Sequence, residues 1–148
     1  MNLKQILFIL SNLLLAVSVA LLVPLAIAAY YNMASGEQDL MAFTKTIVIT
    51  VIVGGILHLA TRDTNRELGN KEGFAIVTFG WILIALAGAL PYFFYQDFLG
   101  NGIDQQVSIF RRFTDRYFEA MSGFSTTGAT ILPEIEHLPH GILFWRSF

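Results

Sequence analysis

Residues 112–130 read RFTDRYFEAMSGFSTTGAT, and this stretch decides how the rest of the chain is interpreted. Its first half carries bulky apolar side chains at spacings of four, four and three, which places them on one face of a helix: Phe113, Tyr117, Met121 and Phe124. Thr114 or Asp115 can cap the start of this helix, and Gly123 stands where a helix should end. We therefore predict a helix over about residues 114–124, which is too short to cross a bilayer.

The second half, from Ser125 to Thr130, has small residues with no charge and no bulky apolar side chain. A short amphipathic helix leading into such a loop is typical of a re-entrant pore loop, because irregular backbone at membrane depth must line a cavity or be buried in protein. The C-terminal end of the helix carries partial negative charge, and Gly128 can turn carbonyls toward one axis. Rings of carbonyls can replace the hydration shell of K⁺. The alternative is an outer loop with a capping helix that happens to contain Thr-Thr-Gly.

Three uncharged runs surround this segment, and each is a candidate membrane span. They cover residues 5–36, 46–61 and 73–96. About 20 residues of helix cross the hydrocarbon, so we predict spans over about 6–31, 41–60 and 74–95, the second with Lys45 reaching the surface. The first run also resembles a secretory signal with a small-residue cleavage site at Ala26-Ile27-Ala28. We favour a span, because the apolar run continues to Tyr30-Tyr31, a pair typical of an interfacial aromatic belt.

The composition agrees with a membrane protein. Of the 148 residues, 55% are hydrophobic and 14% are charged, where soluble domains carry about a quarter charged residues. The net charge of −2 argues against binding to nucleic acid, and the absence of cysteine excludes disulfides, thiolate metal sites and cysteine nucleophiles. These features exclude most water-soluble enzymes.

Three segments together resemble the TrkH-type potassium uptake proteins of the Trk/Ktr/HKT superfamily. FEAMSGFSTTGAT (118–130) looks like the first pore helix and filter of that family. GFAIVTFGWILIALAGALPYFF (73–94) is similar to its first outer helix, and LPHGILFWRSF (138–148) to the start of the helix after the filter. The resemblance covers essentially the whole chain, including two leading spans that TrkH proteins have and Ktr-type members lack.

The resemblance implies an all-α integral membrane fold, in which a potassium-channel-like helix–pore loop–helix repeat follows two extra transmembrane helices. The leading helices occupy residues 1–62 and the repeat occupies 73–148. Within the repeat the resemblance implies an outer helix at 74–95, a pore helix at about 114–124, a filter at 125–130 and the truncated start of an inner helix at 141–148. One loop cannot enclose an ion, so the chain is expected to be a fragment of a pseudo-fourfold pore with three more repeats.

The same resemblance assigns the site. K⁺ would bind at the carbonyls of Thr126, Thr127 and Gly128, with Ala129 and Thr130 completing the filter. The resemblance implies support from the pore helix and its end, at Glu119, Ser122, Gly123 and Ser125. Gly128 would match the first glycine of the TVGYG filter of potassium channels, and the second glycine is missing here, which implies weaker or differently tuned selectivity.

The expected function is potassium uptake across the bacterial inner membrane, without enzymatic activity and with no cofactor bound by this segment. Basic residues give no orientation, because four fall on each side: Lys4, Arg62, Arg66 and Lys71 against Lys45, Arg111, Arg112 and Arg116. The resemblance places the N-terminus in the cytoplasm. It also implies a homodimer and a cytosolic TrkA-like regulatory subunit that binds NAD or ATP. Membrane lipid is an expected partner and nucleic acid is not.

Other polar residues leave alternatives open. The cluster Glu134, Glu136, His137 and His140 could bind a metal, although we favour an acidic outer vestibule. A metal-dependent intramembrane enzyme would need His58 beside that cluster, but the predicted topology puts them on opposite faces. A non-conducting membrane scaffold is a further alternative. Glu119 is either functional or paired with backbone or Arg116, and Arg146 is expected to find its partner in the missing repeats.

Overall fold

The computed structural model describes residues 2–62, 69–95, 98, 108–132, 135–136 and 138–147, and the regular structure in this part is helical. The helices are α1 (Leu3–Ala20), α2 (Leu22–Ser35), α3 (Leu40–Thr61), α4 (Asn70–Phe94), α6 (Ile109–Phe124) and α7 (His140–Ser147). Three apolar helical segments are long enough to cross a membrane: Leu3–Ser35, Leu40–Thr61 and Asn70–Phe94. The prediction of three spans in an all-helical membrane protein is therefore confirmed.

The first span differs from its prediction because it is longer and consists of two helices. It covers 33 residues from Leu3 to Ser35, where we predicted 6–31. The break lies at Leu21, whose N–H still donates to Val17 at 3.0 Å. Pro24 has no N–H to donate to the carbonyl of Ala20, which explains a break one turn before the proline.

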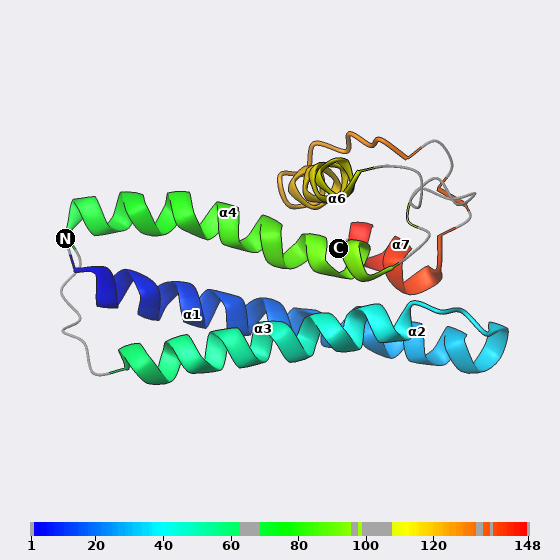
Figure 1. Cartoon of the computed structure of the whole chain (residues 1–148), viewed down its shortest axis with the longest axis horizontal. Coiled ribbons are helices and arrows are strands. Elements are labelled where there is room, and N and C mark those ends of the chain that lie inside the picture. The colour runs from blue at the N-terminus through cyan, green and yellow to red at the C-terminus, as the bar shows by residue number, and fades with distance from the viewer. Residues whose placement is uncertain are drawn as a thin grey trace.

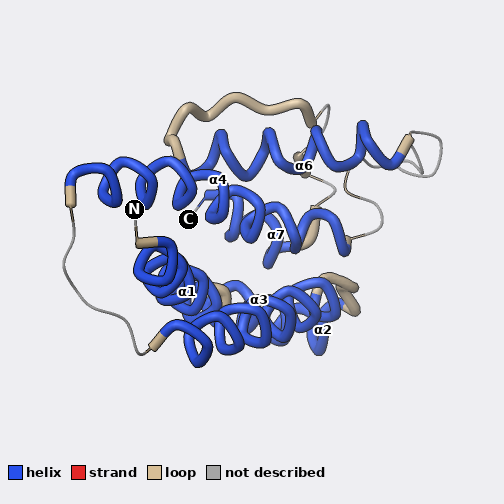
Figure 2. The backbone as a smooth tube through the Cα atoms, turned by 60° about the vertical axis from the view of Figure 1, so that its left-hand side comes forward, coloured by secondary structure: helices blue, strands red, loops and turns tan. Residues whose placement is uncertain are grey.

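The three candidate spans run side by side, so that the molecule is elongated and has two ends (Figure 1). The N-terminus and the start of α4 lie at one end, and the α2–α3 turn lies at the other with α6 and α7 (Figures 1 and 2). Small and polar side chains let α1 and α3 approach closely: Ser18 Oγ donates to Thr50 Oγ1 at 2.9 Å, and a Cβ on Gly54 would lie 3.1 Å from Leu15. The leading helices thus form a scaffold beside α4.

Helix α6 begins earlier than predicted. It starts at Ile109, and the Ser108 hydroxyl accepts from the Arg111 N–H at 3.3 Å, so Ser108 is the N-cap. The proposed caps were wrong: Thr114 lies inside the helix and donates its hydroxyl to the Phe110 carbonyl at 3.0 Å. Asp115 also lies inside, four residues after Arg111, with which it pairs at 3.7 Å.

The face by which α6 attaches to α4 buries polar side chains as well as apolar ones such as Ala120 and Phe124. Arg116 is fully buried, donates from Nε to the Tyr92 carbonyl at 2.8 Å, and lies 5.1 Å from the Phe98 ring centroid. The other buried α6 residues are Glu119, Ala120 and Ser122, whereas Phe113 on the predicted apolar face remains 44% exposed. Helix α6 crosses the direction of the spans, as its end-on view beside α4 shows (Figure 1).

Candidate functional site

The end of α6 reverses the chain through a left-handed residue that is not glycine. The N–H of Thr126 donates to Gly123 at 2.9 Å, and the N–H of Thr127 donates to Ser122 at 3.0 Å. These two bonds form a Schellman motif, in which the first residue beyond the C-cap takes a left-handed conformation. That residue is Thr126, with φ of 54°. A β-branched residue is strained there, so the loop holds backbone strain at the tip of the helix.

Gly128 supplies the second reversal, two residues later. Its φ is 71°, and a Cβ at this position would meet no atom within 4 Å in the described structure. The conformation therefore favours glycine through backbone geometry and not through lack of space.

Helix α6 holds the segment after Gly128 through two of its side chains. Ser122 donates its hydroxyl to the Ala129 carbonyl at 2.7 Å. Glu119 Oε1 accepts from the Thr130 hydroxyl at 2.6 Å and from the Ile131 N–H at 2.7 Å. Ser122 and Glu119 of α6 thus bind three consecutive residues of the loop, 129–131.

Glu119 also joins the loop to α7. Its side chain is 1% exposed, and its Oε2 accepts from Arg146 Nε at 3.2 Å. Of the partners that the sequence left open for Glu119, backbone is confirmed, because the Ile131 N–H donates to its carboxylate, whereas Arg116 donates to the Tyr92 carbonyl. Arg146 has a partner within this chain, contrary to the prediction that it needs the missing repeats. Glu119 therefore connects α6 to both the loop and α7.

Among the described residues, no donor reaches the carbonyl oxygens of Thr126, Thr127 or Gly128. The carbonyls on either side differ, because Ser125 accepts from the Thr126 hydroxyl at 2.8 Å and Ala129 accepts from Ser122. The three free carbonyls are those at which the sequence predicted ion binding. Peptide oxygens without donors are suited to a cation that has lost its water.

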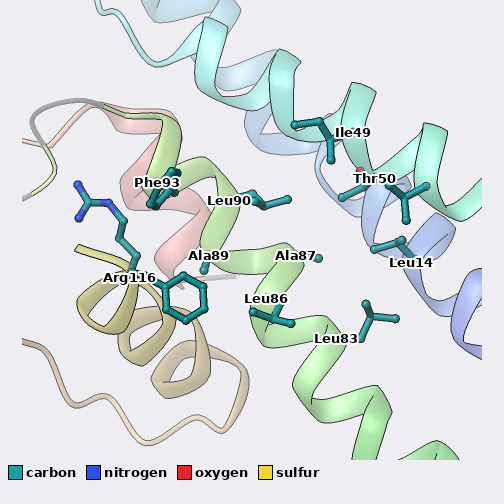
Figure 3. Close-up of a pocket in the computed structure, with 12 residues that line it drawn as sticks. Leu14, Ile49, Thr50, Leu83, Leu86, Ala87, Ala89, Leu90, Phe93 and Arg116 are labelled. Carbon is teal, nitrogen blue, oxygen red and sulfur yellow. The ribbon is translucent and has the colours of Figure 1, made fainter. Parts of the chain in front are cut away.

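A polar cavity of about 350 Å³ lies beside the loop and reaches Glu119, Thr126, Gly128 and Arg146. A second cavity, of about 280 Å³, lies between the leading helices and α4 (Figure 3). Apolar side chains of α1, α3 and α4 line it, and Arg116 stands at its edge (Figure 3). The second cavity has no carbonyl or carboxylate array for an ion, so only the first belongs to the candidate site.

The described residues give no support to a metal site, because no group of three or more His, Cys, Asp or Glu side chains converges among them. His140 pairs with Glu37 at 2.6 Å and stacks on Tyr31, while Glu136 is exposed. Glu134 and His137 of the predicted cluster lie outside the described residues.

His58 lies near the opposite end of α3 from this His140 pair. Its Nδ1 pairs with Asn12 at 2.9 Å, and its ring lies 5.1 Å from that of Phe8. It thus joins α3 to α1, which is a packing role.

Sequence reasoning missed two features of the site. Nothing local marks Thr126 as left-handed, since threonine is disfavoured there. The Glu119–Arg146 pair joins residues 27 positions apart, which no periodicity can reveal. The only indication in the sequence was that Glu119 and Arg146 are charged residues in segments expected to lie within the membrane.

Comparisons with known proteins agree with this geometry. A family model described as TrkH, cation transport protein, matches residues 39–148. The Trk system potassium uptake protein TrkH of Escherichia coli (strain K12) is 34% identical over 147 residues, covering 99% of this chain and 27% of that protein. The Trk system potassium uptake protein TrkG of the same strain is 32% identical over 130 residues, covering 88% of this chain and 24% of that protein.

A solved structure also matches. The crystal structure of the potassium transporter TrkH from Vibrio parahaemolyticus superposes with a TM-score of 0.78 at 30% identity, covering 99% of this chain and 28% of that one. The chain therefore spans about a quarter of the length of the relatives it matches.

Proposed function

Since the chain belongs to the TrkH family of cation transport proteins, we propose that it provides one of four pore loops for potassium uptake across the plasma membrane. The observation that carries this proposal is the set of free carbonyls at Thr126, Thr127 and Gly128. They follow directly on the C-terminal end of α6, whose partial negative charge favours a cation.

The proposed mechanism is dehydration against a prepared backbone. K⁺ enters from the side that the loop faces and exchanges water for the carbonyls of Thr126, Thr127 and Gly128 and their equivalents. Ser122 and Glu119 keep the Ala129–Ile131 backbone in place, so the loop does not need to reorganise when the ion arrives. The membrane potential then contributes about 2.3 kcal/mol per charge per 100 mV to inward movement.

The rest of the transporter is proposed from the family resemblance. Three further helix–pore loop–helix repeats complete the pseudo-fourfold pore, and the protein dimerises in the bacterial inner membrane with its N-terminus in the cytoplasm. A TrkA-like cytosolic subunit carrying NAD or ATP regulates it, and this segment itself holds no cofactor. The relatives are transport proteins, which favours transport over enzymatic activity.

An intramembrane enzyme has little support. His58 lies toward the end of α3 and His140 lies beside Glu37, just before its start, so the two imidazoles are separated by most of the length of a span. Groups at that separation cannot share a proton transfer. A non-conducting scaffold is the alternative that the experiment must decide.

The test compares two glycines with the same backbone conformation. Gly128 has φ of 71° and Gly36 has φ of 74°, and a Cβ would meet no neighbour within 4 Å at either position. Serine at either position therefore meets the same backbone penalty, of about 1–2 kcal/mol. Gly128→Ser and Gly36→Ser are expressed in the full-length transporter, in cells lacking other potassium uptake systems, and K⁺ and Na⁺ uptake are measured at equal membrane abundance.

We expect Gly128→Ser to reduce K⁺ uptake or its preference over Na⁺, and Gly36→Ser to leave both near wild type. Equal behaviour of the two variants would mean that the loop is not a filter, and would favour the scaffold.

A further inference from the structure

Asp39 is a fully buried carboxyl group without a hydrogen-bond partner. Its side chain is 0% exposed at the start of α3, and neither Oδ1 nor Oδ2 has a partner in the described part of the chain. A buried carboxylate with no donor is costly, and such a group commonly becomes neutral by taking up a proton.

The surroundings of Asp39 are tightly packed and mainly apolar. A Cβ added to Gly141 in the first turn of α7 would meet Asp39 Oδ2, lie 2.9 Å from Ala28 Cβ and 3.0 Å from Phe43 Cε2. Ala28 and Phe43 are both fully buried.

Charged and titratable groups surround the same turn of α7. Among the described residues these are Tyr31 at the end of α2, Glu37 in the loop and His140 at the start of α7. Glu37 accepts from the His140 N–H at 2.8 Å and its carboxylate also contacts the imidazole, while the Tyr31 ring stacks on that imidazole at 3.8 Å. The turn between α2 and α3 is thus bound to α7 through the Glu37–His140 pair near the surface, and Asp39 is buried beneath this pair.

Burial raises the pKa of Asp39 above its ordinary value of 3.8, and the nearby Glu37 charge adds to the rise. The N–H group of Asp39 itself opposes this shift most strongly, followed by those of Ile142 and Gly141 at the start of α7, although none has the geometry of a hydrogen bond to the carboxyl. The packed state therefore takes up a proton more readily than a state in which Asp39 meets water.

We propose that Asp39 is a proton-binding site, and that its proton holds the α2–α3 turn against the first turn of α7. Loss of the proton places an unpaired charge among Ala28, Phe43 and Gly141 and weakens this packing. Helix α7 also carries Arg146, which binds the Glu119 carboxylate next to the loop. The inference rests on the proposed function only where it predicts an effect of this packing on the pore. The pH of the solution on the filter side then changes how firmly α7, the helix that supports the filter, is packed.

The sign of the effect follows from linkage. Because the pKa is raised in the packed state, the stabilisation is complete below the ordinary value of 3.8 and is lost as pH rises through the raised pKa. Asparagine has the shape of the protonated carboxyl and does not titrate. Asp39→Asn should therefore match wild type in acid and become the more stable protein as pH rises.

The experiment measures the melting temperatures of purified full-length wild type, Asp39→Asn and Glu136→Gln between about pH 4 and pH 8. Glu136 is an exposed carboxylate in the segment just before α7 and serves as the matched control. We expect the difference between Asp39→Asn and wild type to grow with pH, and that between Glu136→Gln and wild type to stay constant. A difference for Asp39→Asn that is constant, or that falls with rising pH, would overturn the proposal.

A second measurement covers the case in which Asp39→Asn folds poorly. Infrared titration of the wild type should contain a protonated carboxyl band that persists above the ordinary aspartate range and is absent from Asp39→Ser. Disappearance of every such band at the ordinary aspartate pKa would overturn the proposal. Neither measurement uses transport, so a failure of the proposed ion pathway would leave their outcome interpretable.

Discussion

Replacing Glu119 with glutamine removes a buried charge while keeping the size of the side chain. The carboxylate is 1% exposed and accepts three hydrogen bonds, at 2.6 Å from Thr130, 2.7 Å from Ile131 and 3.2 Å from Arg146. Glutamine keeps one oxygen that can accept from the Thr130 hydroxyl and the Ile131 N–H. Toward Arg146 it presents an uncharged NH₂ group, which cannot accept the hydrogen bond from that guanidinium. Removing one partner of a buried ion pair costs about 3–5 kcal/mol.

The lower end of this range applies here, because the Arg146 side chain is 20% exposed and water can replace part of the lost interaction. About 3 kcal/mol corresponds to a factor of roughly 100 in an equilibrium constant. Glu119→Ala should cost more, since it also leaves the Ile131 N–H and the Thr130 hydroxyl without their acceptor.

Asp115 offers a matched control one turn earlier on the same helix. It pairs with Arg111 at 3.7 Å, and the arginine side chain is 68% exposed, so Asp115→Asn should cost less than about 1 kcal/mol. The assay compares thermal unfolding and K⁺ uptake of the full-length protein for Glu119→Gln, Glu119→Ala and Asp115→Asn. Equal stability and uptake in the three variants would refute the claim that Glu119 holds the loop.

Three further changes test other parts of the structure. Gly141→Ala should destabilise the protein by about 1–3 kcal/mol because the added Cβ meets packed atoms, whereas Gly55→Ala has open space in α3 and should be neutral or stabilising. Thermal unfolding of the two variants checks this, and equal melting temperatures would contradict the close packing of α7. Thr126→Gly relieves a positive φ and should raise stability by about 1 kcal/mol while lowering ion selectivity, and unchanged stability would mean that the strain is absent. Cysteine at Ser35 should react with an impermeant thiol reagent from outside intact cells and cysteine at Arg62 should not, and the reverse pattern would invert the proposed orientation.

The membrane spans could be predicted from sequence because one local property decides them. A long, strongly apolar run is stable in hydrocarbon, and this holds for α3 and α4 although each carries charge near its start. The break at Leu21 could also have been anticipated, since Pro24 lacks the N–H that would continue the helix. The length of the first span was underestimated because the helix begins earlier, at Leu3, and continues beyond Tyr31 to Ser35 through the polar residue Asn32.

The start of α6 was misplaced for a physical reason. We started the helix at its candidate caps Thr114 and Asp115, although the apolar spacing of four extends back from Phe113 to Ile109. The cap that starts the helix is Ser108, which contributes hydrogen bonding and no apolar pattern. The periodicity also indicated an apolar buried face, whereas the buried residues of α6 include Arg116 and Glu119 beside Ala120 and Ser122, and of the predicted face Phe124 packs against the core while Phe113 stays exposed. A helix that supports a polar loop buries the side chains that hold it.

The candidate site could be located from sequence, but the contacts that shape it could not. Small residues and Gly128 marked the loop, and Gly128 has the positive φ that its role requires. Glu119 was noted for its intramembrane charge, yet its partners lie 11, 12 and 27 residues further along the chain. Asp39 drew no attention, because its burial depends on the later packing of Gly141 against it.

The central claim is that carbonyl oxygens of Thr126, Thr127 and Gly128 bind the transported ion. The most direct measurement is a crystal structure of the full-length protein with thallium in place of potassium, located by its anomalous scattering. The account predicts thallium on the pore axis in contact with these three carbonyl oxygens. Full occupancy elsewhere along the pore, with none at this loop, would contradict it.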